Sequence, residues 1–418
     1  MFGETAIPAP RAGIAVSPIM MQLPSPEAPP APSAPTPLVT GLLDTAIRFG
    51  LWGALLVGVA EPLRRQPLEQ ILPVLLIFGV IGAGYLLLST DGVARTLRVA
   101  GQSHPLLMAL PPLLLLVPVI AANRATSAPV DLPDALAAFI FVFLPPALAL
   151  INTPRLRAAD AGIGLVAVAA PLTLALARGQ VLTPTDAALR LGAFALPVLL
   201  LLLTNRAQKE RLNFLLLCAA LMLWYAVEFD ALPDVILPPM QAANGGMYFK
   251  LAVLPVFLYA LALAGKFEGL GLRFAPTLKG AGSVALNTAL AAVIILPLAL
   301  LTGFVVFTWS APTPQDAALR FVTIYLSIAL PEEILFRGML LRYLNHTLGW
   351  KPIAIIALSS LIFGAAHLDN PPLVGLYFIF ATIAGVFYAR AFLSTRTVTA
   401  AATVHALVDW IWSVAFPR

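Results

Sequence analysis

The chain has 418 residues, of which 60% are hydrophobic and only 11% are charged, whereas ordinary soluble domains carry about 25% charged residues. With a mean hydropathy of +0.92, this composition predicts a polytopic membrane protein embedded in the lipid bilayer and not a soluble domain. The formal net charge of +5 is small for this length, so a nucleic-acid partner is not expected. Cys218 is the single cysteine, which excludes a disulfide within the chain and a cysteine-rich metal site.

The first 36 residues are rich in proline, with sequences such as PAP and PSPEAPPAPSAPTP. They contain no sustained apolar run, so a secretory signal peptide is not expected. Because such a segment cannot bury enough apolar surface to fold, residues 1–36 are predicted to form a disordered, partly polyproline tail.

Apolar segments of membrane-spanning length follow from about residue 41 onward, and they predict an all-α transmembrane bundle of about thirteen helices. Asp44 and Arg48 lie in the first segment, so an interfacial helix is the alternative there. The segment at 191–204 is short, and it either extends back to Asp186 or breaks near Pro197. The predicted spans are 41–60, 71–90, 105–122, 135–152, 161–177, 191–204, 212–229, 247–265, 283–308, 321–343, 352–368, 372–390 and 397–416.

The distribution of polar residues divides the chain after its tail into two regions. Residues 37–282 form a multi-span helical region with few charges inside its apolar segments and no catalytic pattern. Residues 283–418 contain the polar residues described below and are predicted to be the catalytic helical domain. No internal repeat and no glycine-rich phosphate loop is evident, which argues against a secondary transporter and against an ATP-driven function.

Basic residues in the loops predict the orientation of the protein in the membrane. The positive-inside rule places the basic loops and the N-terminus in the cytoplasm of a bacterial inner membrane and Arg418 outside. Arg64 and Arg65 contradict this orientation, but five later loops outweigh them. Those loops contain Arg155 and Arg157; Arg206, Lys209 and Arg211; Lys266, Arg273 and Lys279; Arg342 and Lys351; and Arg390 and Arg396.

Ionisable residues lie within three of the last apolar segments. Each such residue at the centre of a spanning helix costs about 2.5–3.5 kcal/mol on insertion scales. Because several such residues in neighbouring helices would together be costly to insert, we expect their side chains to meet at one site. They are Glu332, Glu333 and Arg337 in PEEILFRG, His367 in FGAAH, and His405 and Asp409 in HALVD.

The first group combines an expected ion pair with a second carboxylate. Glu333 and Arg337 are four residues apart, so they share a helix face and can pair, which lowers the cost of burying both. Glu332 is rotated by about 100° from Glu333 and needs a different partner. Pro331 predicts that the helix is kinked or restarts there, and a restart would place both carboxylates near the positive end of a helix dipole.

Helical spacing also relates the residues of the other two groups. Phe363 lies one turn before His367 and is expected to pack against its ring, although an interfacial histidine facing lipid headgroups is an alternative. His405 and Asp409 share a helix face, where the carboxylate can fix the tautomer of the imidazole. A satisfied structural hydrogen bond is the alternative interpretation of that pair.

A carboxylate and two histidines that converge in a dry site suit the activation of water. Glu332 would act as the general base, and the imidazoles as hydrogen-bond partners or oxyanion stabilisers. The same set of Glu332, His367 and His405 also matches the three protein ligands of a catalytic zinc site. The residue types alone leave both mechanisms open.

These three groups, in this order, resemble the CPBP family, which includes the type 2 CAAX prenyl proteases and the bacteriocin-processing or Abi proteins. The family is marked by EExxxR, FxxxH and HxxxN or HxxxD. The corresponding sequences here are EEILFR at 332–337, FGAAH at 363–367 and HALVD at 405–409. The resemblance covers about a hundred residues, a quarter of the chain, and it gives no support to a role for the preceding two-thirds.

The resemblance implies an intramembrane endopeptidase that processes leader, sorting or C-terminal segments of protein substrates. It implies that Glu332 is the base, that His367 shares the water, and that His405 and Asp409 face the oxyanion, with Glu333, Arg337 and Phe363 as structural support. Where members with Asn use its amide as a donor, an ionised Asp409 can only accept, so it would instead orient and charge His405.

A glutamic mechanism without a cofactor is favoured over a zinc mechanism, because the sequence lacks an HExxH arrangement. The loop charges place His367 near the outer end of its helix, so the site is expected to open toward the outside. The alternative functions are a non-catalytic membrane scaffold or immunity protein and, with less support, an ion-coupled transporter.

Overall fold

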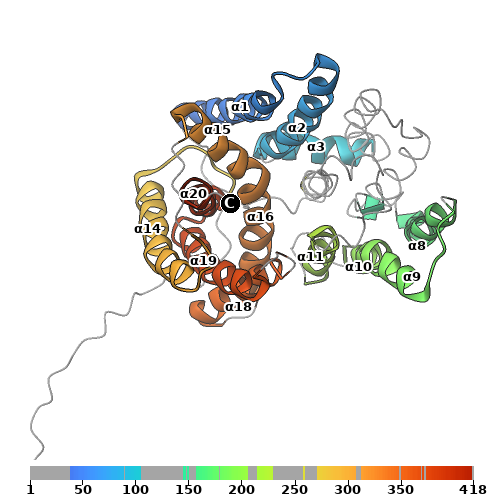
Figure 1. The fold of residues 1–418 in the computed structure, drawn as a ribbon. Helices are drawn as coiled ribbons and strands as arrows, with labels where there is room; N and C mark the ends of the chain where they lie inside the picture. The colour runs from blue at the N-terminus through green and yellow to red at the C-terminus, as the bar shows by residue number, and fades with distance from the viewer. Residues whose placement is uncertain are drawn as a thin grey trace, which may run out of the picture. The chain divides into compact units, whose positions relative to one another are not determined.

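In a computed structural model of the protein, every regular element among the described residues is a helix (Figure 1). These residues all lie in one compact unit, Pro37–Arg418. The predicted tail at 1–36 and the predicted span at 105–122 lie outside them, as do most of 135–152 and 247–265. The described residues are 38–88, 90–104, 145–146, 148–149, 157–177, 179–205, 214–228, 258, 271–306, 312–347, 350–368, 370 and 373–416.

The helices of the first half are α1 (Leu38–Ala60), α2 (Leu68–Leu88), α3 (Asp91–Ser103), α8 (Asp160–Ala177), α9 (Pro184–Arg190), α10 (Leu196–Asn205) and α11 (Phe214–Glu228). A short 3₁₀ turn, Glu61–Leu63, follows α1, and a π-helical turn, Leu191–Ala195, joins α9 to α10. The span predicted at 191–204 therefore extends back beyond Asp186 and does not break at Pro197. Its start is set by a capping box in which Thr183 and Asp186 bond each other's backbone N–H groups.

The helices of the second half are α14 (Leu278–Leu301), α15 (Pro314–Ile324), α16 (Leu330–Glu333), α17 (Arg342–Thr347), α18 (Pro352–Ala365), α19 (Val374–Thr395) and α20 (Val398–Ala415). The predicted domain boundary at 283 falls inside α14. In Figure 1, α19 and α20 lie inside a ring made by α14, α15, α16 and α18. The packing agrees, since α19 contacts α14, α18 and α20, and α20 also contacts α14, α15 and α16.

Six helices among the described residues are long and apolar enough to cross a membrane, which fits a multi-pass membrane protein. The predicted number of about thirteen spans is not confirmed, because several predicted spans lie largely outside the described residues. Two others form shorter apolar helices, Val74–Leu88 and Pro352–Ala365. The six are Thr40–Ala60, Asp160–Ala177, Pro184–Leu203, Leu278–Leu301, Val374–Thr395 and Val398–Ala415.

A glycine allows α18 and α19 to pack closely. A Cβ atom at Gly364 would lie 2.0 Å from Oγ1 of Thr382 and 2.9 Å from the carbonyl oxygen of Phe378. A side chain at position 364 would therefore collide with α19. Small residues at such contacts allow membrane helices to pack closely. The contact holds the end of α18, and with it His367, against α19.

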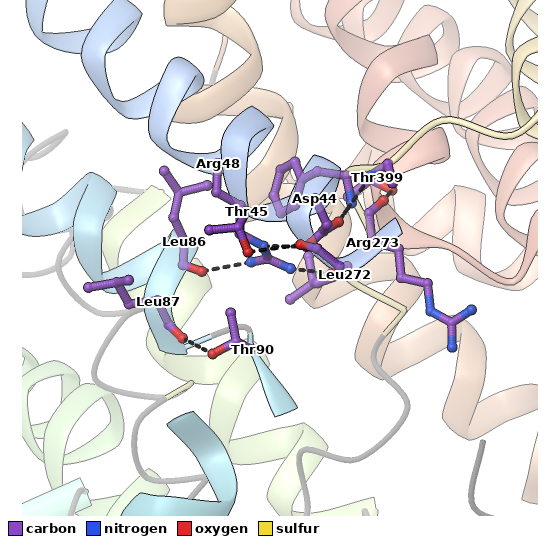
Figure 2. Close-up of polar contacts among 12 residues, drawn as sticks. Asp44, Thr45, Arg48, Leu86, Leu87, Thr90, Leu272, Arg273 and Thr399 are labelled. Atoms are coloured by element: carbon purple, nitrogen blue, oxygen red, sulfur yellow. Dashed lines mark hydrogen bonds and ion pairs between the residues drawn. The ribbon is translucent and has the colours of Figure 1, made fainter. Parts of the chain in front are cut away.

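The two charged residues of α1 anchor the segment that precedes α14 (Figure 2). Asp44 accepts hydrogen bonds from the backbone N–H groups of Phe274 at 2.5 Å and Ala275 at 3.0 Å. Its other oxygen accepts from Nε of Arg48 at 2.6 Å. Both carboxylate oxygens of Asp44 therefore have hydrogen-bond partners inside the protein. These partners account for a charged residue in an apolar helix without an interfacial location.

Arg48 extends this anchor to α2. Its guanidinium donates to the carbonyl oxygens of Leu86 at 2.6 Å and Leu272 at 2.7 Å, and it lies 4.5 Å above the ring of Phe274. The middle of α1, the end of α2 and the segment before α14 are therefore held together, as Figure 2 shows.

The same segment is bonded to the start of α20. The N–H of Val398 donates to the carbonyl oxygen of Gly271 at 3.0 Å. The hydroxyl of Thr399 donates to the carbonyl oxygen of Arg273. Gly271 has φ +73°, and a Cβ atom there would lie 2.5 Å from the carbonyl oxygen of Arg396, so both its conformation and its space require glycine. These bonds connect α1 to the helix that carries His405.

Candidate active site

The predicted glutamate pair lies within one continuous helical stretch from Pro314 to Thr347. Wide π-helical turns, Tyr325–Ala329 and Ile334–Leu341, flank the short α16 that contains both glutamates. Such turns are rare and are frequent at functional sites. Here they set the direction in which the two carboxylates point.

Of the two alternatives at Pro331, a kinked helix or a restarted one, the restart does not occur. Ala329 has φ −65° and ψ −48°, so the backbone continues as a helix through the proline. The N–H of Leu330 donates five residues back, to the carbonyl oxygen of Tyr325. This wide turn accommodates Pro331, which lacks an N–H of its own. The glutamates are therefore not at the start of a helix, and the helix dipole does not stabilise them there.

The predicted ion pair between Glu333 and Arg337 is present and completely buried. Nη1 of Arg337 lies 2.7 Å from Oε1 of Glu333, and both side chains are 0% exposed. Nη2 donates to the carbonyl oxygen of Gly385 at 3.0 Å, where a Cβ atom would lie 3.2 Å from this nitrogen. The guanidinium also lies 4.4 Å above the ring of Phe363 and 5.2 Å above that of Tyr388.

His405 is surrounded by three carboxylates. Its Nδ1 lies 3.0 Å from Oε1 of Glu333, and its Nε2 lies 3.4 Å from Asp409 and 3.9 Å from Oε2 of Glu332. The ring of Tyr388 stacks on the imidazole with centroids 4.5 Å apart and an interplanar angle of 15°. With acidic oxygens at both nitrogens, the ring can act as a donor on both sides, as a doubly protonated imidazolium does.

Glu332 was expected to need a partner other than Arg337, and it faces His405. Its side chain is 6% exposed and faces Nε2 of His405, the nitrogen on the opposite side of the ring from Glu333. Two adjacent glutamates thus face the two nitrogens of one imidazole.

His367 has a defined tautomer. Its Nδ1 lies 3.1 Å from the carbonyl oxygen of Phe363. Because a carbonyl oxygen only accepts, Nδ1 carries the hydrogen, and the lone pair of Nε2 remains available to accept a proton or a hydrogen bond. His367 is half-buried, and its ring stacks on that of Tyr377.

The ring of Phe363 brings the two histidines together. Its centroid lies 5.0 Å from that of His367, as the one-turn spacing predicted, and 5.6 Å from that of His405. Phe336 meets the same ring edge-on at 5.1 Å. Glu332, Glu333, Arg337, His405 and Asp409 are thus joined by polar contacts, and His367 adjoins them through Phe363.

The structure also contains contacts that the sequence did not predict. Glu333 was expected to pair with Arg337 alone, but its Oε1 also faces His405. Tyr377 and Tyr388 each cover one face of a site histidine. In the sequence these tyrosines are aromatic residues of an apolar helix, a pattern typical of ordinary core residues, so no signal marked them.

A metal site was the alternative interpretation of Glu332, His367 and His405. Among the residues that the structure describes, no group of three or more His, Cys, Asp or Glu side chains is arranged to hold a metal ion.

Comparison with known proteins identifies the family of this region. Residues 314–411 match the family described as type II CAAX prenyl endopeptidase, Rce1-like, a range that contains the whole cluster from Glu332 to Asp409. No curated protein and no solved structure matches the chain significantly. The match confirms the resemblance drawn from the three motifs and supports intramembrane CAAX protease activity in broad terms. Residues 314–411 of this multi-pass membrane protein therefore match the Rce1-like family, which is consistent with a CPBP family intramembrane protease.

Proposed function

We propose that the protein is a glutamic intramembrane endopeptidase in which Glu332 activates the attacking water. The observation that carries this proposal is the different setting of two adjacent carboxylates. Glu333 is held by Arg337 at 2.7 Å and by His405 at 3.0 Å, which stabilises its ionised form and occupies it. Glu332 faces the same imidazole from the other side at 3.9 Å, which is longer than a hydrogen bond, so the two carboxylates differ in how tightly the cluster holds them.

In this mechanism Glu332 takes a proton from water while the water oxygen attacks the carbonyl carbon of the scissile peptide bond. Nε2 of His367 accepts the second hydrogen of that water as a hydrogen bond and so aligns it. The C–N bond then breaks as the protonated Glu332 gives its proton to the leaving nitrogen. The products are a new carboxylate and a new amine, and Glu332 is restored.

His405 is the proposed donor to the tetrahedral oxyanion. Its Nδ1–H is held by Glu333, so Nε2–H is directed toward Glu332 and Asp409, where the substrate carbonyl would lie. Asp409 is 34% exposed and acts on the oxyanion only through His405, by favouring the protonated ring. A preorganised donor of this kind contributes about 2.7–4 kcal/mol to transition-state stabilisation.

The proposed substrates are membrane-associated protein segments that reach the outer side of the membrane, and a farnesylated CAAX peptide, taken from the family description, is a first probe of the purified protein. The test compares protein termini in membranes of cells that contain the wild-type protein, lack it, or contain Glu332→Gln. We expect at least one protein to keep an extra terminal segment in the second and third cases. Identical termini in all three would refute the protease function.

Chelation distinguishes the glutamic mechanism from a zinc mechanism. Cleavage of a quenched fluorescent peptide that ends in a farnesylated CAAX sequence should survive prolonged treatment with a zinc chelator, because no proposed step uses a metal. Elemental analysis should find no stoichiometric zinc in the purified protein. Stoichiometric zinc that is lost together with activity in His367→Ala would overturn the glutamic mechanism in favour of a metal-bound water.

We propose that the site opens on the outer side of the membrane. Arg48, in the middle of α1, is bonded to the end of α2 and to the segment before α14, and that segment is bonded to the start of α20. The basic residues Arg273, Lys279 and Arg396 lie near these contacts, in the segment before α14, at the start of α14 and between α19 and α20, and the positive-inside rule makes this the cytoplasmic end. His367 follows α18, which runs away from the basic residue Lys351.

A cysteine at Leu368 tests this orientation, because Leu368 is 46% exposed and follows His367 directly. We expect Leu368→Cys to react with a membrane-impermeant thiol reagent added to intact cells, in a background where Cys218 is replaced by Ala. Reaction only after the cytoplasmic face is opened would reverse the orientation and make the substrate a cytoplasmic segment.

A further inference from the structure

Three half-buried aromatic rings from three helices form a column beside the cluster. His367, just after α18, stacks on Tyr377 of α19 with centroids 5.4 Å apart and an interplanar angle of 18°. Tyr377 in turn stacks on Trp412 of α20 at 6.1 Å and 27°. Phe304, which follows α14 and is 5% exposed, meets both Tyr377 and Trp412 edge-on, at 5.7 Å and 4.9 Å.

This column supplies a restraint that the backbone at His367 does not. α18 ends at Ala365, so His367 lies in the turn that follows it and not in a regular helix. The bond from its Nδ1 to the carbonyl oxygen of Phe363 fixes one atom of the ring. Rotation of the ring about that bond is limited by the stacked face of Tyr377, which is itself held by Trp412 and Phe304.

From this geometry we infer that Tyr377 is a positioning residue for His367: its ring keeps the imidazole oriented, so that the lone pair of Nε2 points toward the attacking water. The inference rests on the proposed function, because the orientation of the imidazole affects the reaction only if His367 aligns the attacking water. It adds a residue of α19 that lies outside all three family motifs. Tyr377 touches the imidazole and not the reacting atoms, so its effect on the reaction passes through His367.

The effect is expected in turnover and not in substrate binding. A misplacement of about 1 Å at a reacting group can lower a rate by about 10²-fold. With the farnesylated CAAX peptide as the probe, Tyr377→Leu should lower kcat by about 10- to 100-fold and leave KM within about twofold. Tyr377→Phe keeps the ring and should stay within about threefold of wild-type kcat.

Phe380 provides the matched control. It lies one turn further along α19, is 4% exposed, and packs against the same Phe304 at 4.8 Å. Its ring has no stacking contact with His367 among the described ring contacts. Phe380→Leu removes a comparable aromatic group from the same helix, so it should lower thermal stability while kcat stays near wild type. A loss of kcat equal to that of Tyr377→Leu would show that general packing, and not the stack on His367, is responsible.

A second measurement needs no substrate. The chain contains 4 histidines, so a ¹⁵N-histidine NMR spectrum of the full-length protein is simple, and His367→Gln assigns the signal. Wild type and Tyr377→Phe should show His367 with the hydrogen on Nδ1, and Tyr377→Leu should show averaged tautomers. An unchanged tautomer and kcat in Tyr377→Leu, or a Tyr377→Phe variant as impaired as Tyr377→Leu, would overturn the inference. A wild-type protein that cleaves nothing while this tautomer change occurs would refute the proposed function and still support the positioning of His367.

Discussion

Replacing Glu332 by Gln is expected to abolish peptide cleavage, with a fall in kcat of at least about 10³-fold. General-base catalysis contributes about 10²–10⁴-fold, and in the proposed mechanism the same group also returns the proton to the leaving nitrogen, which a glutamine amide cannot do. Glutamine has nearly the shape of glutamate, and Glu332 is not the partner of Arg337. The variant should therefore express and melt like wild type.

The measurement is the rate of cleavage of the farnesylated CAAX peptide by purified protein, together with the yield and melting temperature of each variant. Loss of activity with retained stability would assign Glu332 to the chemistry. Wild-type rates from Glu332→Gln would remove it from the mechanism, and a large loss of stability would make it a structural carboxylate.

Glu333→Gln should have the opposite effect, lowering the amount of folded protein before it affects the reaction. Its carboxylate meets Arg337 at 2.7 Å and His405 at 3.0 Å, and the Glu333 and Arg337 side chains are both 0% exposed. Removing one partner of a buried ion pair costs about 3–5 kcal/mol, because the remaining charge stays buried without compensation. The sequence predicted this cost from Arg337 alone, and the contact with His405 increases it.

The double variant Glu333→Gln, Arg337→Met is the informative control, because it removes both charges and so relieves the unpaired guanidinium. It should recover part of the melting temperature that Glu333→Gln loses, without recovering activity, since His405 loses its Glu333 partner in both. Equal melting temperatures for Glu333→Gln and wild type would contradict the structural role of the pair.

The contacts that helical spacing alone determines were predictable from the sequence. Glu333 with Arg337 and Phe363 with His367 are each four residues apart, so any helix through them brings the side chains together. His405 and Asp409 are a third such pair, with Nε2 and Oδ2 3.4 Å apart. An all-helical fold followed from composition and hydropathy in the same way.

The sequence predicted that the polar groups of different helices meet at one site, but it did not predict which side chains contact each other. Glu333 and His405 are 72 residues apart, and their meeting depends on which side of each helix faces the other. The π-helical turns at Tyr325–Ala329 and Ile334–Leu341 change the number of residues per turn beside the glutamates, and nothing in the sequence marked these turns. The same turns explain why Pro331 does not restart the helix, which was one of the two alternatives that its missing N–H suggested.

The first span shows a similar limit. Asp44 and Arg48 suggested an interfacial helix, because charged residues in an apolar segment need a polar environment. That environment is supplied by backbone groups more than two hundred residues later, at Leu272, Phe274 and Ala275. A sequence pattern identifies a need for partners but does not reveal partners so far along the chain.

The fate of the water oxygen bears most directly on the role of Glu332. In a single turnover with excess protein in H₂¹⁸O, a general base directs all of the label into the product. The new C-terminal carboxylate should therefore carry one ¹⁸O, and the proteolytic fragment of the protein that contains Glu332 should carry none. Label in that fragment would instead indicate that Glu332 attacked the substrate and formed an anhydride that water then opened, which would contradict water activation by Glu332.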